Sequence, residues 1–267
     1  MVVEQKLLEL ALRFPTNGFS RCYGRIRNQG LKWNHKRVKR VYNKLHLNLR
    51  RKAKRRLPVR VKQPLQVPDT INQTWSMDFM TDSLESGRKF RTFNLIDDYN
   101  REALAIEIDT SLCGERIVRV LEQTIDWRGK PQQIRSDNGP EFLSQALTDF
   151  CNQQNIRLKY IQPGKPMQNG YIERFNKTYR TNVLDAYIFH SLDEVRQITA
   201  GWQQDYNEKH PHQSLQGLSP RDFANRAMNS GKLPASISPE KFTTIHSANH
   251  NDNLEEIKNE NVYFRPV

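Results

Sequence analysis

Three acidic residues occupy positions from which they could take part in chemistry. Asp78 lies within the largely apolar run TWSMDFMT, Asp137 follows the short apolar stretch in IRSDNGPEF, and Glu173 begins a helical pattern after the loop QPGKPMQNG. Aspartate is depleted in strands and costly to bury without a partner. Carboxylate oxygens are ligands that Mg²⁺ prefers, and two such ions about 3.5–4 Å apart promote in-line displacement at phosphorus. Together the three acids predict a divalent-metal site that acts on phosphate esters.

Each acid also has a structural explanation when it is taken alone. Asp78 is compatible with a strand position that faces water. The residues SDNGP are typical of a turn, because Asp, Asn, Gly and Pro favour turn conformations. Glu173 and Lys177 are four residues apart and would form a helix-surface pair that contributes only about 0.2–0.5 kcal/mol. That pair explains Lys177 but not the coincidence of Glu173 with the other two acids.

The elements that must position these acids follow from the hydrophobic pattern. The pattern predicts strands over 74–81, 89–99 and 102–111, a short strand that leads into Asp137, and a strand over 157–161. It predicts helices over 115–129, 144–154, 171–188 and 191–208. Three strands in a meander, followed by alternating helices and strands, indicate a mixed α/β sheet covered by helices. Asp97 and Asp98, at the end of the second strand, are predicted to be structural.

The helix predicted over 171–188 has two distinct faces. Its apolar face should pack on the sheet and consists of Ile172, Phe175, Tyr179 and Val183. Glu173, Lys177 and Arg180 share the other face. A metal ligand followed by two cations suits a phosphate backbone that passes the metal.

The first 49 residues predict a small helix-turn-helix unit of three helices. Asn34 is a candidate N-cap for the third helix, which has an apolar face and a basic face. Lys36, Arg37 and Arg40 belong to the basic face and are candidate DNA contacts. The alternative is a solvated basic face on an ordinary helical hairpin.

Charge divides the chain unevenly and supports the DNA-binding interpretation. The net charge is +13, but residues 1–63 carry 19 Lys and Arg against two acids. Such asymmetry is typical of a nucleic-acid-binding segment. We therefore divide the chain into a DNA-binding unit at 1–49, a basic Pro-containing linker at 50–69, a catalytic core at 70–225 and a polar tail at 226–267.

Several classes of protein are excluded by composition. The three cysteines are widely spaced and odd in number, which fits a reduced cytoplasmic protein and not a disulfide framework. No stretch is apolar for long enough to span a bilayer. The first 14 residues contain acids and a lysine within their apolar pattern, so they predict an amphipathic helix and not a signal peptide.

Five segments resemble the OrfB transposases of the insertion-sequence-three family: WSMDFM, FNLIDDYNRE, SDNGPEF, QPGKPMQNGYIERFN and DYNEKHPHQSLQGLSP. Thirty-five residues separate Asp137 from Glu173. The set Asp78, Asp137 and Glu173 is similar to the DDE catalytic triad of retroviral-integrase-like enzymes, which have a ribonuclease-H-like fold. The similarity runs from about residue 70 to about residue 225, and residues 1–50 resemble the helix-turn-helix segment of that family.

The resemblance implies an activity and a set of site residues. Asp78, Asp137 and Glu173 match the catalytic, metal-binding triad, with Mg²⁺ as cofactor and Mn²⁺ as its substitute. Arg180 matches a basic position that contacts DNA ends. Lys165, Gln168 and Asn169 match the loop that borders the active site, and with Lys177 they complete the candidate DNA contacts.

The expected function is Mg²⁺-dependent cleavage and strand transfer of double-stranded DNA at the ends of an insertion element. The resemblance also implies a homo-oligomer on DNA, an upstream OrfA partner or frameshift fusion, and a nucleoid-associated place in the bacterial cytoplasm. Two alternatives stay open: a catalytically silent, DNA-binding transposase remnant that acts as a regulator, and a ribonuclease H of similar fold. A ribonuclease H would have little use for the basic N-terminal segment.

Overall fold

The computed structural model describes residues 2–49, 67–162 and 166–229. The predicted tail after residue 229, most of the predicted linker and the candidate DNA contact Lys165 lie outside these residues. No described helix is long and apolar enough to cross a membrane.

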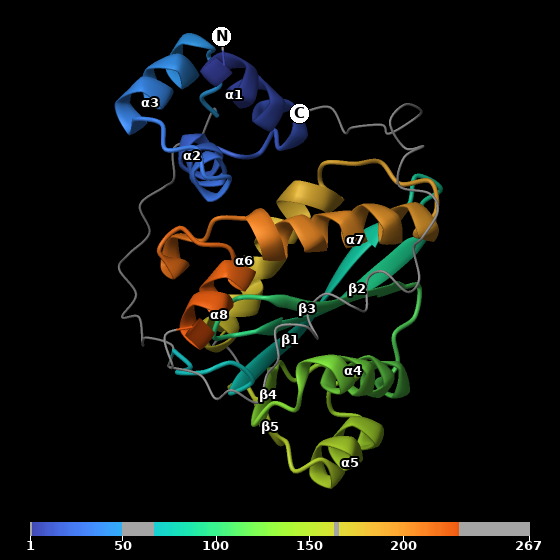
Figure 1. The fold of residues 1–267 in the computed structure, drawn as a ribbon. Coiled ribbons are helices and arrows are strands. Elements are labelled where there is room, and N and C mark those ends of the chain that lie inside the picture. The colour runs from blue at the N-terminus through green and yellow to red at the C-terminus, as the bar shows by residue number, and fades with distance from the viewer. Residues whose placement is uncertain (1, 50–66, 163–165, 230–267) are drawn as a thin grey trace.

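A five-stranded mixed sheet forms the centre of the molecule, in the order β3-β2-β1-β4-β5 (Figure 1). The strands are β1 (Thr74–Ser83), β2 (Lys89–Asp97), β3 (Ala103–Asp109), β4 (Gln133–Ser136) and β5 (Arg157–Tyr160). β1, β2 and β3 are antiparallel, whereas β4 pairs parallel to β1 and β5 pairs parallel to β4. This topology, with helices on both faces, confirms the predicted ribonuclease-H-like fold.

Helices cover both faces of the sheet and bury two separate cores (Figure 1). The helices are α4 (Gly114–Arg128), α5 (Gln145–Gln153), α6 (Gly170–Tyr179), α7 (Leu192–Lys209) and α8 (Pro220–Asn229). Side chains alternate along β1, so Trp75 and Met77 pack in the core under α4 and α5, while Met80 packs in the core under α6 and α7. Asp78 has the same parity as Met80 and therefore faces α6.

The helix that carries Glu173 differs from its prediction at one end. Ile172, Phe175, Tyr179 and Val183 are all buried, as predicted. However, α6 ends at Tyr179 and continues as a π-helical turn over Arg180–Leu184, where the backbone amide of Asp185 donates to the carbonyl of Arg180. The hydroxyls of Thr178 and Thr181 donate to carbonyls four residues earlier, a contact that bends helices.

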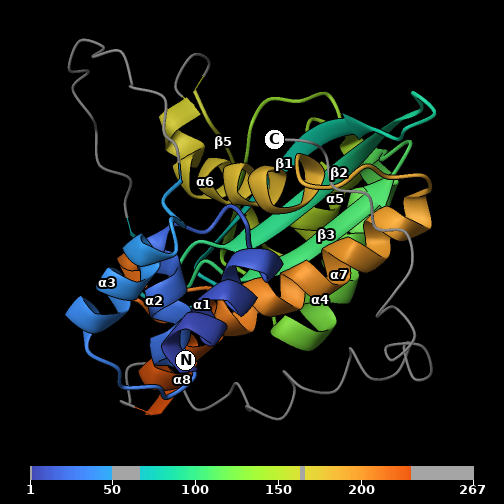
Figure 2. The same cartoon turned by 90° about the horizontal axis from the view of Figure 1, so that it is seen from above.

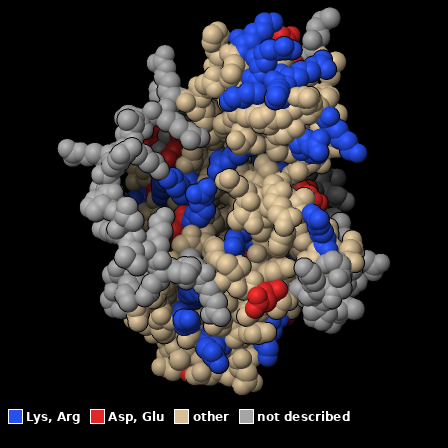
Figure 3. Space-filling model, turned by 90° about the vertical axis from the view of Figure 1, so that its left-hand side faces the viewer, with Lys and Arg blue, Asp and Glu red and all other residues tan. Residues whose placement is uncertain are grey.

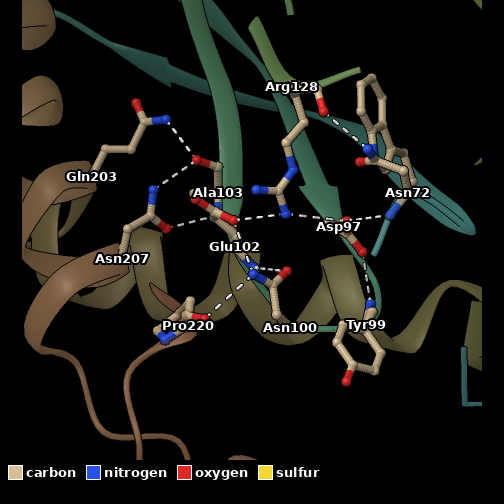
Figure 4. Close-up of polar contacts among 11 residues, drawn as sticks. Asn72, Asp97, Tyr99, Asn100, Glu102, Ala103, Arg128, Gln203, Asn207 and Pro220 are labelled. Atoms are coloured by element: carbon tan, nitrogen blue, oxygen red, sulfur yellow. Dashed lines mark hydrogen bonds and ion pairs between the residues drawn. The ribbon is translucent and has the colours of Figure 1, made fainter. Parts of the chain in front are cut away.

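A buried charged network joins the β2–β3 turn to α4, and Figure 4 shows its contacts. The Arg128 guanidinium lies 2.8 Å from Glu102 Oε2 and 3.4 Å from Asp97 Oδ2. Asp97 also accepts hydrogen bonds from the backbone amides of Asn72 and Tyr99. Burial raises the pKa of Asp97, and the Arg128 charge opposes that rise. This network is structural, as predicted for Asp97.

The same turn is tied to the C-terminal helices. Asn207, on α7, accepts from the amide of Ala103 and donates to its carbonyl, and Gln203 donates to that same carbonyl (Figure 4). Asp98, the neighbour of Asp97, pairs with Arg135 of β4 at 3.0 Å. Asp97 therefore stabilises the junction between the sheet and α4, while Asp98 ties the end of β2 to β4.

The N-terminal unit is a three-helix bundle with its own core. Its helices are α1 (Val2–Arg13), α2 (Phe19–Asn28) and α3 (His35–Lys44). The side chain of Asn34 accepts the amide of Lys36 at 2.8 Å, which confirms the predicted N-cap. A buried ion pair joins this unit to the core, because Arg25 of α2 meets Asp205 of α7 at 2.5 and 3.1 Å. Figure 2 shows the three helices lying beside the end of α7.

Candidate metal centre

Asp78 is held at the centre of the sheet by two hydrogen bonds. Its Oδ1 accepts from the backbone amide of Phe79 at 2.8 Å. Its Oδ2 accepts from Nδ2 of Asn176 on α6, also at 2.8 Å. The carboxylate therefore has one oxygen fixed by its own strand and the other by the helix that carries Glu173.

Asn94 completes a bridge from the neighbouring strand. It is the register partner of Asp78 across β1 and β2, it is fully buried, and its Nδ2 donates to Oδ1 of Asn176 at 2.7 Å. Asn94 thereby fixes which way the Asn176 amide points, so that Nδ2 faces Asp78. Neither asparagine was predicted from the sequence, although Asn176 is a polar residue among the apolar positions of the helix over 171–188, which is a signal for a buried polar role.

Asp137 lies in a turn that directly follows β4. Its Oδ1 accepts from the amide of Gly139 at 2.9 Å, so the turn that SDNGP predicted is present. A Cβ at Gly139 would lie 3.1 Å from that oxygen, so a larger residue there would require the Asp137 carboxylate to shift by a few tenths of an ångström. Asn138 donates to the carbonyl of Ile161 after β5. The turn thus presents the Asp137 carboxylate at the end of β4. The segment can therefore be a turn and also carry a candidate metal ligand.

An aromatic contact fixes this turn against the strand of Asp78. Phe142 is buried and stacks on Phe79, with ring centroids 4.8 Å apart. The Arg91 guanidinium lies over the Phe79 ring and pairs with Glu141. The residue after Asp78 and the end of the Asp137 turn therefore belong to one packed unit.

Glu173 lies in the first turn of α6 and is exposed. Its carboxylate forms no hydrogen bond or ion pair with a residue that the structure describes. Partial burial raises its pKa. An exposed, unpaired side chain at a helix start can change rotamer at little cost.

Electrostatic repulsion links the three carboxylates. The pKa of Asp78 is raised to about 6, mainly by burial and further by the charges of Asp137 and Glu173. Like charges raise a carboxyl pKa in this way when they lie near one another. In this conformation, no group of three His, Cys, Asp or Glu side chains among the described residues is close enough to hold a metal ion. In this conformation the charges of Asp137 and Glu173 therefore affect Asp78, but the three carboxylates do not form a complete set of metal ligands.

The donor chemistry of this neighbourhood nevertheless fits a hard divalent cation. All three candidate ligands are carboxylates, which Mg²⁺ and Mn²⁺ prefer. A buried carboxyl whose pKa is raised by two other acids is a position where added positive charge is favourable. Because the exposed Glu173 side chain can change rotamer, its carboxylate can move to complete the set of metal ligands.

Of the candidate DNA contacts Gln168 and Asn169, one lies beside Asp78. Asn169 is buried at the start of α6 and donates to the carbonyl of Met77, the residue before Asp78, at 3.4 Å. Gln168 pairs with Gln162, accepting from its amide at 2.9 Å. Gln168 is therefore tied to the end of β5, whereas Asn169 is tied to β1.

The predicted DNA contacts occupy different environments. Lys177 is exposed on α6, whereas Arg180 donates to the carbonyl of Thr81 and pairs with Asp82 near the end of β1. Lys36, Arg37 and Arg40 are exposed on α3. These residues stay predicted DNA contacts, and Arg180 is already engaged with the protein in this conformation.

Comparisons with known proteins show the family to which the chain belongs. A family model described as integrase core domain matches residues 68–166, and a second model with the same description matches residues 154–220. The chain is 37% identical over 236 residues to an uncharacterized 31.7 kDa protein of insertion element IS407 from Burkholderia multivorans, covering 88% of this chain and 85% of that protein. The chain belongs to the insertion-sequence-three transposases. This family is part of the retroviral-integrase-like superfamily.

Other similarities cover smaller shares. An IS476 protein from Xanthomonas euvesicatoria is 37% identical to this transposase over 219 residues, 82% of this chain and 63% of that protein. The catalytic core domain of HTLV-2 integrase in complex with magnesium is 19% identical, with a TM-score of 0.43 over 57% of this chain and 96% of that chain. A simian T-cell lymphotropic virus intasome has a TM-score of 0.49 at 15% identity over 72% of this chain and 67% of that chain.

Proposed function

We propose that this transposase cuts DNA at the ends of its insertion element and joins the resulting 3′-hydroxyl to a target phosphate. The observation that supports the proposal is the raised pKa of Asp78, because part of that rise comes from the charges of Asp137 and Glu173. The three acids come from β1, from the turn after β4 and from the start of α6, so residues far apart in the sequence act on one carboxylate.

In this mechanism Asp78, Asp137 and Glu173 hold divalent cations, Mg²⁺ or Mn²⁺. When bound, such cations activate a water or a 3′-hydroxyl and stabilise the leaving oxygen. Asn176 and Asn94 keep Asp78 oriented toward the site. The exposed Lys177 attracts the phosphate backbone beside Glu173. No covalent bond between protein and DNA is needed.

The same proposal predicts the partners of this transposase and its location. We expect a homo-oligomer that pairs two element ends, in a nucleoid-associated location in the bacterial cytoplasm. A protein from an upstream reading frame, or a frameshift fusion with it, is expected to contribute to recognition of the ends.

The direct test uses labelled DNA duplexes that carry the element's own ends. The chain is incubated with them in Mg²⁺, Mn²⁺ or EDTA, both alone and with the upstream partner. Nicked and joined products are expected in Mg²⁺ and Mn²⁺ and not in EDTA. DNA binding without products under every condition would instead support a transposase remnant that regulates, and cleavage confined to an RNA–DNA hybrid would support a ribonuclease H.

Replacing Asn176 with Ala is expected to slow strand cleavage about 10- to 100-fold with little change in DNA affinity, the range seen when a hydrogen bond to a metal ligand is lost. The substitution leaves Asp78 Oδ2 and Asn94 Nδ2 without their shared partner. Single-turnover cleavage measures the effect. Asn152→Ala, an exposed substitution on α5, serves as the control. Equal rates for the two variants would show that the bridge does not orient Asp78.

A further inference from the structure

A cleft of about 1420 Å³ lies between the three-helix unit and the catalytic core. One wall comes from α2, α3 and the residues that follow α3. The other comes from α6, the end of α7 and the loop over 210–217. This loop belongs to the DYNEKHPHQSLQGLSP segment, and neither the metal centre nor the sheet has supplied a role for residues 210–217.

The charge of the cleft is strongly biased. Four cationic side chains line it: Arg21, Lys39, Arg101 and Arg174. None of the described residues that line it is acidic. Figure 3 shows basic side chains gathered over the three-helix unit at the top of one face and continuing below it. A cavity of this size with cations on both walls and no described acid favours a polyanionic ligand.

Arg101 is held toward the cleft in an unusual way. Its backbone has a φ of 63°, a conformation that side-chain-bearing residues rarely adopt. Its guanidinium lies over the ring of Tyr171, 3.5 Å from the centroid. Its Nη1 is buried and has no hydrogen-bond partner among the described residues. A buried donor of this kind calls for an acceptor that the described part of the chain does not provide.

Two neutral histidines sit in the same positive field. His210 stacks on Tyr206, and its Nδ1 is buried without a partner in the described chain. Burial lowers the pKa of His212 to about 3, with further lowering by Arg101, Arg21 and Arg174. The positive charges of arginines from both walls therefore disfavour the charged form of His212.

The cleft is built by specific contacts between the two units. Arg25 and Asp205 form the buried ion pair described above, and Thr16 hydrogen bonds with Asn182 at 2.6 Å. Asn28 donates to the carbonyl of Gly217. Charged and polar groups from both sides thus fix the spacing of the walls.

We propose that this cleft binds the phosphate backbone of a DNA strand. The inference rests on the proposed function, because that function supplies DNA as the polyanion. Arg174 directly follows Glu173 on α6 and lines the cleft, so the cleft and the candidate metal centre lie on neighbouring sides of the same helical turn. The basic wall on α2 and α3 then holds the strand from the other side.

The first test measures DNA affinity without metal, so that no cleavage is required. Arg174→Gln and Lys39→Gln each remove one cation from opposite walls. Each is expected to weaken binding of a fluorescent duplex about 3- to 10-fold and to reduce the slope of log K against log salt by about 0.9, the value for one lost phosphate contact. Arg119→Gln, on an exposed position of α4 across the sheet, is the matched control and should bind as wild type.

The second test locates the DNA and keeps every cation in place. Ser214 lines the cleft, and Cys113 is the exposed native cysteine before α4. In one protein, which carries Cys113→Ser and Ser214→Cys, a thiol-reactive photo-crosslinker is attached at position 214. In the wild type the same reagent is attached to Cys113. Crosslinks to DNA are expected from position 214 and not from Cys113.

The outcomes separate the cleft from the catalytic proposal. Unchanged affinity and salt slope in both cleft variants, or crosslinking from Cys113 alone, would overturn the cleft as a DNA site whatever the cleavage assay shows. Weakened binding with crosslinks at position 214, in a protein that never cleaves, would support the cleft and reject the catalytic role. If a charge variant fails to fold, as thermal unfolding would reveal, the crosslinking result still decides.

Discussion

Replacing Asp137 with Asn is expected to reduce strand cleavage by about 1,000-fold or more, which corresponds to about 4 kcal/mol of lost transition-state stabilisation. Asn keeps the size of the side chain, and its carbonyl oxygen can still accept the hydrogen bond from the Gly139 amide. What it loses is the negative charge that a divalent cation requires. The turn should therefore survive while the metal centre fails.

The control for this prediction is Asp149→Asn. Asp149 is an exposed carboxylate on α5 that accepts a hydrogen bond from Gln145, so the substitution makes the same chemical change away from the metal centre. It should cleave DNA as the wild type does, and both variants should bind DNA with wild-type affinity. Wild-type cleavage by the Asp137 variant would refute the assignment of the triad.

A spectroscopic measurement tests the same site without activity. Because Asp137 contributes to raising the pKa of Asp78, its neutralisation should move that pKa down from about 6. Carboxyl NMR of the metal-free protein measures the shift. An unchanged pKa of Asp78 would show that the two acids do not share a neighbourhood.

Local patterns were sufficient to predict the strands of the sheet and the element that carries each of the three acids: a strand for Asp78, a turn for Asp137 and a helix for Glu173. Strand alternation placed Asp78 within β1, and the turn residues after Ser136 marked where β4 ends. Helical spacing assigned the buried face of α6, because burial repeats every three to four residues along one helix. These features depend only on neighbours in the sequence.

Long-range pairing could not be predicted in the same way. Asn94 faces Asp78 only because of the β1–β2 register, and Asn176 joins them from an element more than 80 residues away. The Arg25–Asp205 ion pair likewise links residues 180 positions apart. No local pattern encodes such contacts.

Arg180 illustrates a second limit. Its spacing from Glu173 predicted a shared face, on the assumption of a continuous α-helix. The α-helix ends at Tyr179, and the Arg180 side chain contacts Asp82 and Thr81 near the end of β1. A π-helical turn depends on tertiary packing and hydroxyl contacts, so periodicity alone does not reveal it.

Replacing Arg128 with Met is expected to lower the free energy of unfolding by about 3–5 kcal/mol, the cost of removing one partner from a buried ion pair. The side chains of Arg128 and Asp97 are fully buried and that of Glu102 is nearly so. The substitution leaves two carboxylates in the protein interior without their shared cation. Urea unfolding followed by circular dichroism measures the loss.

Arg116→Met is the matched control, because Arg116 lies on the same helix and pairs with Glu107 where both side chains are partly exposed. That pair should contribute no more than about 1 kcal/mol. The deficit of Arg128→Met should also depend on pH. Without the guanidinium the native pKa of Asp97 rises further above its unfolded value, so the deficit is largest at neutral pH and shrinks as the pH falls toward the pKa of the unfolded chain. Equal losses from the two arginines, or a pH-independent deficit, would contradict a structural role for the buried network.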